Sequence, residues 1–181
     1  GHGDYRLITL APSTVQEMVD FVKLGFDLAF KYRNPVMILA DGALGQMMEK
    51  VELFEAIPRS TEIPEWATVG KPKTRERNII TSLHMEPEKM EEINHHLQKK
   101  YKEIENNEIR YEMIDCEDAE IVLVAFGLVA RICTKAAHLA REKGIKVGVF
   151  RPISLFPYPY EQISKLSEKV NANDPTNELP K

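Results

Sequence analysis

The sequence predicts an α/β fold made of three-layer, parallel-sheet βαβ units. The run 121–126 is apolar at every position, which suits a strand that is buried on both faces of a parallel sheet. The segment 128–143 repeats apolar residues at three- and four-residue spacing, as a helix with one buried stripe does. A second, largely apolar run at 145–150 follows, and a crossover of this kind is almost always right-handed.

The front of the chain carries a second unit of the same kind. Residues 7–10 form a short apolar strand, and Ser13 with Gln16 three residues later has the arrangement of a capping box. A helix is expected over 13–32, and the next strand over 36–39. Two strands and one helix cannot bury their apolar faces alone, so this unit needs further partners. The apolar stripe of its helix consists of Val15, Met18, Val19, Val22, Phe26, Ala29 and Phe30.

Residues 43–118 differ from both units. The stretch 57–73 holds three prolines and the only tryptophan and is expected to be an irregular connector, whose length favours a domain boundary. Pro87 opens a charged helix that extends to about residue 107. Its narrow apolar stripe suits a helix that lies across a surface or between subunits, and a short edge strand is expected at 110–114. The stripe consists of Met90, Ile93, Leu97, Tyr101 and Ile104.

The helix at 128–143 is expected to end at Gly144 in a left-handed cap. The three prolines within 152–159 cannot continue a helix or a central strand, yet the residues between them are too apolar for a solvated loop. Two interpretations remain: an extended, partly buried segment docked on another surface, or a rigid turn over the carboxyl edge of the sheet. The residues of the helix expected to face the sheet are Val129, Ile132, Cys133, Ala136, Ala137 and Ala140.

Several strings of this chain resemble one family. The segment 126–159, with Phe-Gly-x-x-Ala-Arg-Ile-Cys and Arg-Pro-Ile-Ser-Leu-Phe-Pro-Tyr-Pro, resembles the transketolase-C-terminal-like domain in the alpha-type subunit of 2-oxoacid:ferredoxin oxidoreductases. The strings 3–18 and 33–42 resemble the end of the pyrimidine-type domain in the same subunit. The strings 77–87 and 97–105 are most similar to the branched-chain, or 2-ketoisovalerate, type.

The resemblance implies three parts. Residues 1–56 are expected to be the incomplete end of the thiamine-pyrimidine-type domain, and 57–109 a connector with a charged helix. Residues 110–181 are expected to form the transketolase-C-terminal-like domain, although 171–181 does not resemble the further strand that the family would place there. The start at Gly1 suggests part of a longer subunit.

The resemblance also implies an activity. Members of this family are enzymes of anaerobic metabolism that use thiamine diphosphate with magnesium and iron–sulfur clusters. The whole complex is expected to decarboxylate a branched-chain 2-oxoacid oxidatively with coenzyme A, yielding an acyl-CoA and passing electrons to ferredoxin. The glutamate that activates the cofactor is expected upstream of Gly1, and the diphosphate and cluster sites in other subunits.

The expected contribution of this chain is scaffold and subunit interface. Alone, it is expected to be inactive, to bind no thiamine diphosphate and to associate with itself as a homodimer. We therefore assign no catalytic or metal-binding residue, and leave the cofactor-binding residues unknown. Asp41-Gly42 lacks the preceding glycine and the following Asn-Asn pair of the magnesium–diphosphate signature. Asp4, Tyr5 and Arg6 either contribute to a subunit interface or form a solvated strand entry.

The remaining polar candidates are weak. His95 and His96 are adjacent, so on a helix they point about 100° apart and cannot share a metal. His84 and His138 have no clustered carboxylate or cysteine and are expected to be structural. A helix N-terminus at Leu128 offers an anion site, but a lone glycine before it is little support for a phosphate loop.

Composition is consistent with a cytoplasmic location. The formal net charge of −4 gives no sign of polyanion binding, and 43% hydrophobic residues can supply a core. Two cysteines, Cys116 and Cys133, fit no cluster spacing and suggest a reducing compartment, with Cys133 in the core and Cys116 partly exposed. No apolar run reaches the roughly 18 residues of a membrane span, and there is no signal-peptide pattern.

Two other functions compete with this assignment. One is a transketolase-like beta subunit of a 2-oxoacid dehydrogenase complex, which the charged middle helix and the Arg-Pro-Ile-Ser-Leu-Phe-Pro string make less favourable. The other is a non-catalytic αβ module that binds a protein partner through residues 86–107.

Overall fold

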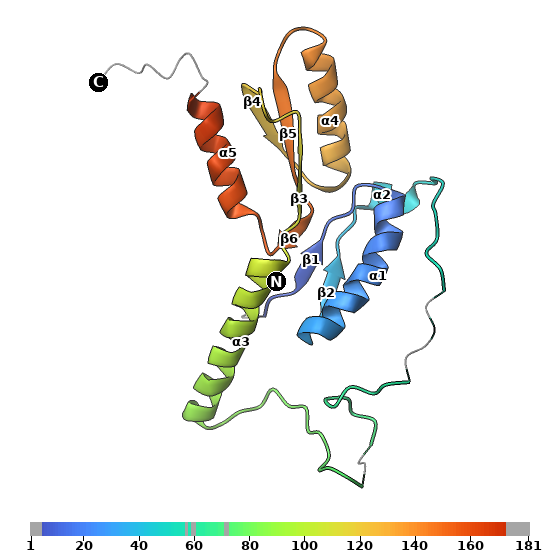
Figure 1. Cartoon of the computed structure of the whole chain (residues 1–181), viewed down its shortest axis with the longest axis vertical. Helices are drawn as coiled ribbons and strands as arrows, with labels where there is room; N and C mark the ends of the chain where they lie inside the picture. The colour runs from blue at the N-terminus through green and yellow to red at the C-terminus, as the bar shows by residue number, and fades with distance from the viewer. Residues whose placement is uncertain (1–4, 57, 59–60, 71–72, 173–181) are drawn as a thin grey trace, which may run out of the picture. The chain divides into compact units, whose positions relative to one another are not determined.

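The computed structural model describes residues 5–56, 58, 61–70 and 73–172 (Figure 1). The chain divides into two compact units. One contains the residues up to Leu53 together with those from Lys100 onward, and the other contains Phe54–Lys99. All the strands of the described residues belong to the first unit.

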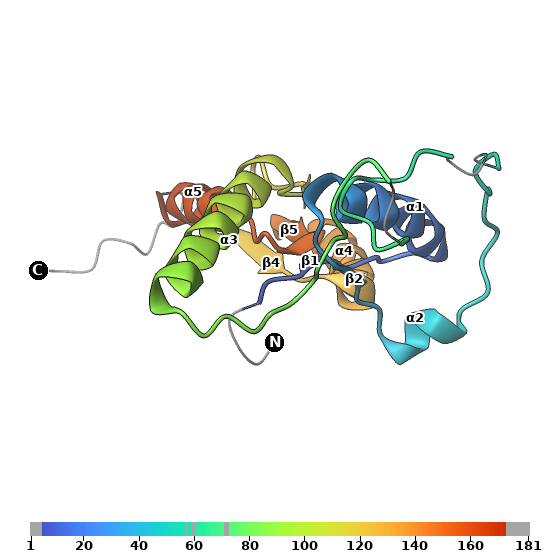
Figure 2. The same ribbon diagram turned by 90° about the horizontal axis from the view of Figure 1, so that it is seen from below.

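The first sheet is built on the front of the chain. Strands β1 (Ile8–Leu10) and β2 (Val36–Ile38) are parallel, and helix α1 (Val15–Tyr32) connects them (Figure 2). The expected βαβ unit is therefore present. The third strand, β6 (Ser154–Phe156), pairs with β1 in the antiparallel direction, and the order is β2-β1-β6. The sheet is thus mixed, where an all-parallel sheet was expected, because its third strand comes from the proline-rich segment 152–159.

Helix α1 begins one residue later than the capping-box pattern predicted. Thr14 is the N-cap, and its hydroxyl accepts a hydrogen bond from the Glu17 backbone N–H at 3.1 Å. The Glu17 carboxylate in turn accepts bonds from the backbone N–H and the hydroxyl of Ser13, at 2.7 and 3.1 Å. The Glu17 carboxylate lies three residues after Thr14 and accepts two hydrogen bonds from Ser13. This capping arrangement explains why the N-cap is Thr14 and not Ser13.

The second sheet has the order β3-β5-β4. Strands β4 (Ile121–Val124) and β5 (Val147–Pro152) are parallel and joined by helix α4 (Gly127–Arg141), as predicted. The short edge strand expected at 110–114 is β3 (Tyr111–Ile114), and it runs antiparallel to β5. This sheet is therefore mixed as well: the all-parallel expectation was wrong for β3, which enters from a connector and not from a crossover helix.

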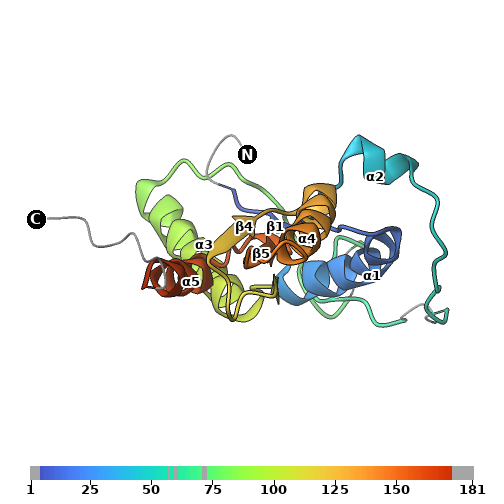
Figure 3. The ribbon, with the colours of Figure 1, turned by 90° about the horizontal axis from the view of Figure 1, so that it is seen from above.

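Helices cover both faces of the second sheet. Phe150 packs with Leu166 of helix α5 (Tyr160–Ala172), and Val149 packs with Ala137 of α4. The two helices lie on opposite sides of β4 and β5 (Figures 1 and 3). This is the predicted three-layer arrangement, although sequence reasoning did not find α5.

Helix α4 turns only part of its expected stripe to the sheet: Cys133, Ala137 and Ala140 pack there as predicted. Ala130 and Ala137 are buried, whereas Val129 and Ile132 are 57% and 61% exposed. Small residues let the helix axis approach the sheet closely, and the larger residues are displaced to the outer side. Two apolar stripes therefore run along α4, and only the alanine-rich stripe belongs to the core of this chain.

The proline-rich segment 152–159 is extended and docked on another surface, which is the first of the two interpretations given above. It continues from β5 in the second sheet to β6 in the first, and the Ala11 backbone N–H donates to the Ile153 carbonyl at 2.8 Å. Pro157 and Pro159 are buried. One stretch of backbone thus holds the two sheets together.

Helix α3 (Pro87–Asn107) has the predicted bounds. Its last turns belong to the first unit, where Tyr101 and Ile104 are buried. The apolar stripe therefore ends in the core of the chain itself and is not free for another subunit over its full length. Helix α2 (Gly42–Gln46) is a single short turn.

The unit Phe54–Lys99 contains the irregular connector. Between α2 and α3 no helix or strand occurs among the described residues. Within this unit the Asn78 side chain donates to the carbonyls of Glu65 and Ala67, at 2.5 and 3.1 Å. Among the residues that the structure describes, no helix combines the length and apolar character needed to cross a membrane.

Candidate functional site

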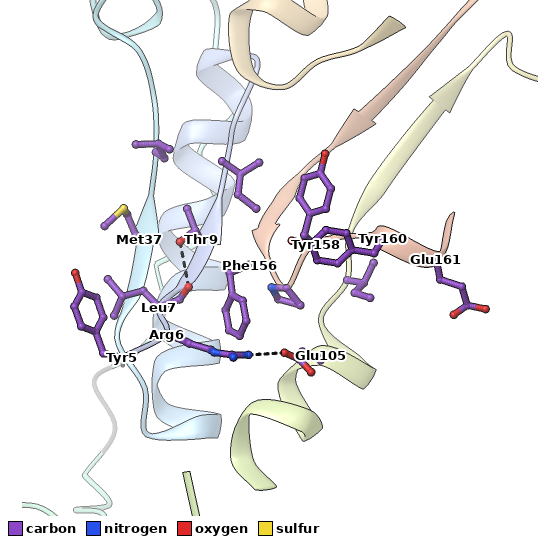
Figure 4. A pocket seen from close by; sticks show the side chains of 14 residues that line it. Tyr5, Arg6, Leu7, Thr9, Met37, Glu105, Phe156, Tyr158, Tyr160 and Glu161 are labelled. Carbon is purple, nitrogen blue, oxygen red and sulfur yellow. Dashed lines mark hydrogen bonds and ion pairs between the residues drawn. The ribbon is translucent and has the colours of Figure 1, made fainter. Parts of the chain in front are cut away.

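A hollow of about 850 Å³ opens on the first sheet (Figure 4). Its side chains come from β1, β2 and β6, from the end of α3 and from the start of α5. Most of them are apolar or aromatic. The lining residues are Tyr5, Arg6, Leu7, Thr9, Met37, Leu39, Glu105, Ile109, Leu155, Phe156, Pro157, Tyr158, Tyr160 and Glu161.

The floor of the hollow is the sheet face that points away from α1. Gly25 of α1 faces Val36 and Ile38, as a side chain added there would lie 3.5 Å from Val36 Cγ1. Because successive strand residues point to opposite faces, Met37 and Leu39 point to the other side. They line the hollow and are 41% and 42% exposed.

Aromatic rings form the opposite wall. The rings of Tyr158 and Tyr160 lie 4.9 Å apart between centroids, and Phe156 meets Tyr101 edge-on at 6.4 Å. The buried Pro157 and Pro159 hold this segment extended, so the rings between and after them project together into the hollow (Figure 4).

Arg6 closes one end. Its guanidinium carbon lies 5.5 Å from the ring centroid of Tyr101 and 5.7 Å from that of Phe156. Its Nη1 is 2.9 Å from Glu105 Oε1, and both side chains are nearly half exposed. The pair is therefore modest in energy, but the stacking fixes Arg6 at the rim.

The hollow is suited to contact with an apolar surface. Its two carboxylates, Glu105 and Glu161, are each ion-paired, with Arg6 and Lys165. The hydrogen bond from Lys165 lowers the pKa of Glu161, so this group is a poor proton donor. The polar atoms that remain at the rim are mainly tyrosine hydroxyls, which suit the border of a binding surface.

A second polar cluster joins helix α1 to the second sheet. Arg151 of β5, whose side chain is 7% exposed, donates to Glu17 Oε2 at 2.5 Å and to Glu112 Oε2 at 3.1 Å. Burial opposes ionisation of Glu17, but the bonds from Arg151 and Ser13 outweigh it, and the pKa of Glu17 is lowered. A cleft of about 510 Å³ lies beside this cluster.

A third cluster surrounds Glu108, which is 3% exposed. Its carboxylate accepts hydrogen bonds from Tyr32 Oη at 2.6 Å and Lys31 Nζ at 2.8 Å, and lies 2.9 Å from Arg110 Nη2. Burial opposes ionisation, yet these donors together lower the pKa of Glu108. The cluster fastens α1 to the segment between α3 and β3.

Of the sequence candidates, Tyr5 and Arg6 line the hollow, and Asp4 lies outside the described residues. Asp41 is the N-cap of α2, where its Oδ1 accepts from the Leu44 N–H at 2.8 Å. Gly127 at the start of α4 has φ +60°, and a side chain there would come within 3.7 Å of the Pro12 carbonyl.

The histidines and cysteines are scattered. His138 Nε2 lies 3.8 Å from Asp115, and His95 Nε2 lies 3.7 Å from Glu91. Cys116 is buried at 3% exposure, so the expectation that it is partly exposed was wrong; it packs under Phe150 and Leu166. The described residues contain no group of three or more His, Cys, Asp or Glu side chains placed to hold a metal ion.

Sequence reasoning missed Arg151, Glu17 and Glu108. One signal in the sequence could have identified Arg151. It is a single charge that follows the apolar run of a central strand, and a buried charge must be paired. The partners of Glu108 lie far away in the sequence, and no local pattern identifies them.

The fold and the hollow define an α/β protein with an open, largely apolar sheet face. Comparison with known proteins identifies its family. The family model described as pyruvate flavodoxin/ferredoxin oxidoreductase, thiamine diphosphate-binding, matches residues 2–115, and the model of pyruvate:ferredoxin oxidoreductase core domain II matches residues 119–173. The chain belongs to this oxidoreductase family.

Curated relatives are subunits of such enzymes. The ketoisovalerate oxidoreductase subunit VorB of Methanothermobacter marburgensis is 49% identical over 168 residues, which are 93% of this chain and 47% of the relative. The 2-oxoglutarate synthase subunit KorA of Methanocaldococcus jannaschii is 35% identical, over 93% of this chain and 52% of the relative. The chain thus spans about half the length of the curated relatives it matches.

A solved structure supports the fold. The 2-oxoglutarate:ferredoxin oxidoreductase of Magnetococcus marinus, which has 2-oxoglutarate, coenzyme A and succinyl-CoA bound, superposes with a TM-score of 0.71. The match covers 93% of this chain and 34% of that chain, at 21% identity.

Proposed function

We propose that this chain is part of a subunit of a thiamine-diphosphate-dependent 2-oxoacid:ferredoxin oxidoreductase of the branched-chain type. The complex oxidatively decarboxylates a branched-chain 2-oxoacid, such as 2-ketoisovalerate, to its acyl-CoA and passes the electrons to ferredoxin. The observation that carries the proposal is the 49% identity with a ketoisovalerate oxidoreductase subunit across 93% of the chain.

Within the complex, this chain supplies scaffold and subunit interfaces. Strand β6 connects the two sheets, and the Arg151 and Glu108 clusters fasten helix α1 to the second sheet and to the segment before β3, which gives a rigid support. The hollow on the first sheet offers an apolar surface for a partner. The role fits the chemistry of the lining, whose carboxylates are already ion-paired.

The cofactors act elsewhere in the complex. Thiamine diphosphate with magnesium would supply the decarboxylation chemistry, and iron–sulfur clusters would carry the electrons. The partners are the other subunits, a ferredoxin, the 2-oxoacid and coenzyme A, in the cytoplasm of an anaerobic cell. We assign three parts to the chain. Residues 1–56 are the end of the pyrimidine-type domain, residues 57–109 are a connector, and residues 110–181 form the transketolase-C-terminal-like domain.

Substrate selectivity tests the branched-chain assignment. The complex that contains this chain is purified anaerobically, and the kcat/KM for coenzyme-A-dependent electron transfer is measured with 2-ketoisovalerate and with 2-oxoglutarate. We expect the first to exceed the second by at least about tenfold, since carboxylate recognition separates the two substrates strongly. Equal kcat/KM values for the two substrates, or a preference for 2-oxoglutarate, would contradict the branched-chain type. They would not affect the assignment to the oxidoreductase family.

A further inference from the structure

The stretch between Asn78 and helix α3 exposes large apolar side chains in close succession. Four of them, within seven residues, are between 61% and 83% exposed. Contiguous exposed apolar surface usually marks a site of contact with another protein. The four residues are Ile79, Ile80, Leu83 and Met85.

The backbone of 79–85 is also unpaired. Among the described residues it makes no hydrogen bond to another backbone group, and the Leu83 N–H donates to the Thr81 hydroxyl at 3.1 Å. The stretch belongs to no helix or strand (Figure 1). Both of its ends are fixed, because the Asn78 side chain is hydrogen-bonded within its own unit and α3 begins at Pro87. It is thus a short arm whose backbone donors and acceptors are open to another chain.

The sequence of this arm alternates as the sequence of a strand does. Successive side chains of a strand point to opposite faces, so every second residue shares a face. An alternation of apolar and polar residues is typical of a strand with one buried face, and here Ile80 is the one exception. The residues of the apolar face are Ile79, Thr81, Leu83 and Met85, and those of the other face are Asn78, Ile80, Ser82, His84 and Glu86.

A basic stretch comes directly before the arm. Residues 73–77 hold three cationic side chains and one carboxylate, in a chain whose formal net charge is −4. Lys73 and Arg77 are exposed and form no ion pair within the described part of the chain, and Arg75 donates to backbone carbonyls. A partner with acidic side chains beside 73–77 would therefore be complementary in charge.

We propose that residues 79–85 pair as an added strand with an exposed sheet edge of another subunit of the oxidoreductase. This inference rests on the proposed function. An added strand binds through its backbone hydrogen bonds, and the side chains of one face enter pockets that give specificity. Ile79, Leu83 and Met85 fill apolar pockets of the partner, and acidic side chains of the partner lie beside 73–77.

Hydrogen exchange tests the backbone pairing. The complete oxidoreductase complex, purified anaerobically, is compared with this chain alone, and exchange is read for each amide. Pairing along one edge engages the N–H of every second residue, so alternate amides of 79–85 should exchange at least about tenfold more slowly in the complex. Uniformly fast exchange of this stretch in the complex, or protection of consecutive amides as in a helix, would overturn the proposal.

Two charge substitutions test the alternation. Leu83→Glu places a charge on the apolar face and is expected to weaken binding to the other subunits, purified without this chain, at least about tenfold, because the charge would be buried without a partner. The matched control is Ile80→Glu, which adds the same charge to the other face and should change the dissociation constant by no more than about twofold. Circular dichroism should show both variants folded, because both side chains are exposed. Equal weakening by the two substitutions would refute the pairing as a strand.

Activity separates this inference from the proposed function. A complex that oxidises a branched-chain 2-oxoacid while 79–85 exchanges as fast as in the chain alone would overturn the inference and leave the proposed function standing. A complex that shows alternate protection but oxidises no branched-chain 2-oxoacid would contradict the proposed function and support the strand pairing.

Discussion

Arg151 connects helix α1 to the second sheet, and its replacement by Met tests how much that connection contributes to stability. The guanidinium is buried between Glu17 of α1 and Glu112 of β3, with one nitrogen bonded to each carboxylate. Methionine keeps much of the buried aliphatic volume and removes both ion pairs. The change therefore isolates the polar contribution as far as a single substitution can.

The expected loss follows from what the substitution leaves behind. Removing one partner of a fully buried ion pair typically costs about 3–5 kcal/mol. Here Glu17 is 25% exposed and keeps both bonds from Ser13, while Glu112 is 48% exposed and regains water. We therefore expect the free energy of unfolding to fall by about 2 kcal/mol. In the double variant Glu17→Gln/Arg151→Met the loss should be smaller than the sum of the two single losses.

The effect should depend on pH. The pKa of Glu17 in the folded chain is lowered from its ordinary 4.5 because the bonds from Arg151 and Ser13 outweigh burial. A lowered folded pKa adds stability above the unfolded pKa, and this stability is lost as the pH falls through the folded pKa. The difference between the unmodified chain and Arg151→Met should thus be constant near neutral pH and shrink below pH 4.5.

Urea unfolding followed by far-ultraviolet circular dichroism measures this loss. The control is Lys165→Met, which removes an exposed ion pair with Glu161 and should leave the midpoint unchanged. If Arg151→Met unfolds at the midpoint of the unmodified chain at neutral pH, the Arg151 cluster does not stabilise the contact between helix α1 and the second sheet. A difference that grows toward acid would contradict the assignment to Glu17.

Three other outcomes are expected. Gly148→Ala should destabilise the chain by about 1–3 kcal/mol in thermal unfolding, because its side chain would lie 2.8 Å from the Asp115 carbonyl, whereas Gly45→Ala has open space and should be neutral or stabilising. Phe156→Ala should lower the free energy of unfolding by about 2 kcal/mol, since this half-buried ring packs β6 on Tyr101, and an unchanged urea midpoint would refute that role. The isolated chain should associate with itself, most simply as a two-fold dimer, and a mass by light scattering that stays monomeric at every concentration would refute this.

Local patterns predicted the parts of the fold that depend on local chemistry. The apolar run 121–126, the helix after it and the run 145–150 became β4, α4 and β5 in the parallel pairing expected. The prolines of 152–159 left two interpretations, an extended docked segment or a rigid turn, and the structure shows the extended segment. The structure adds that this segment is β6 of the first sheet.

The features that sequence reasoning missed depend on distant contacts. Helix α4 has two adjacent apolar stripes, and only the structure shows that Ala130 is buried while Val129 and Ile132 are exposed. Helix α5 begins directly after Pro159 and was not predicted from the sequence. The hollow brings together residues from 5 to 161, so no motif spans it. Tyr5 and Arg6 were identified as interface candidates through the family resemblance, and the structure places both at the hollow.

Add-back to the enzyme tests most directly whether the chain is an essential, non-catalytic part of the proposed oxidoreductase. The remaining polypeptides of the complex are assembled anaerobically with and without this chain, and ferredoxin reduction is followed with 2-ketoisovalerate, coenzyme A and thiamine diphosphate. We expect reduction only when the chain is present, no reduction by the chain alone, and no thermal shift of the chain alone with thiamine diphosphate. Full activity without the chain, or ferredoxin reduction by the chain by itself, would contradict this role.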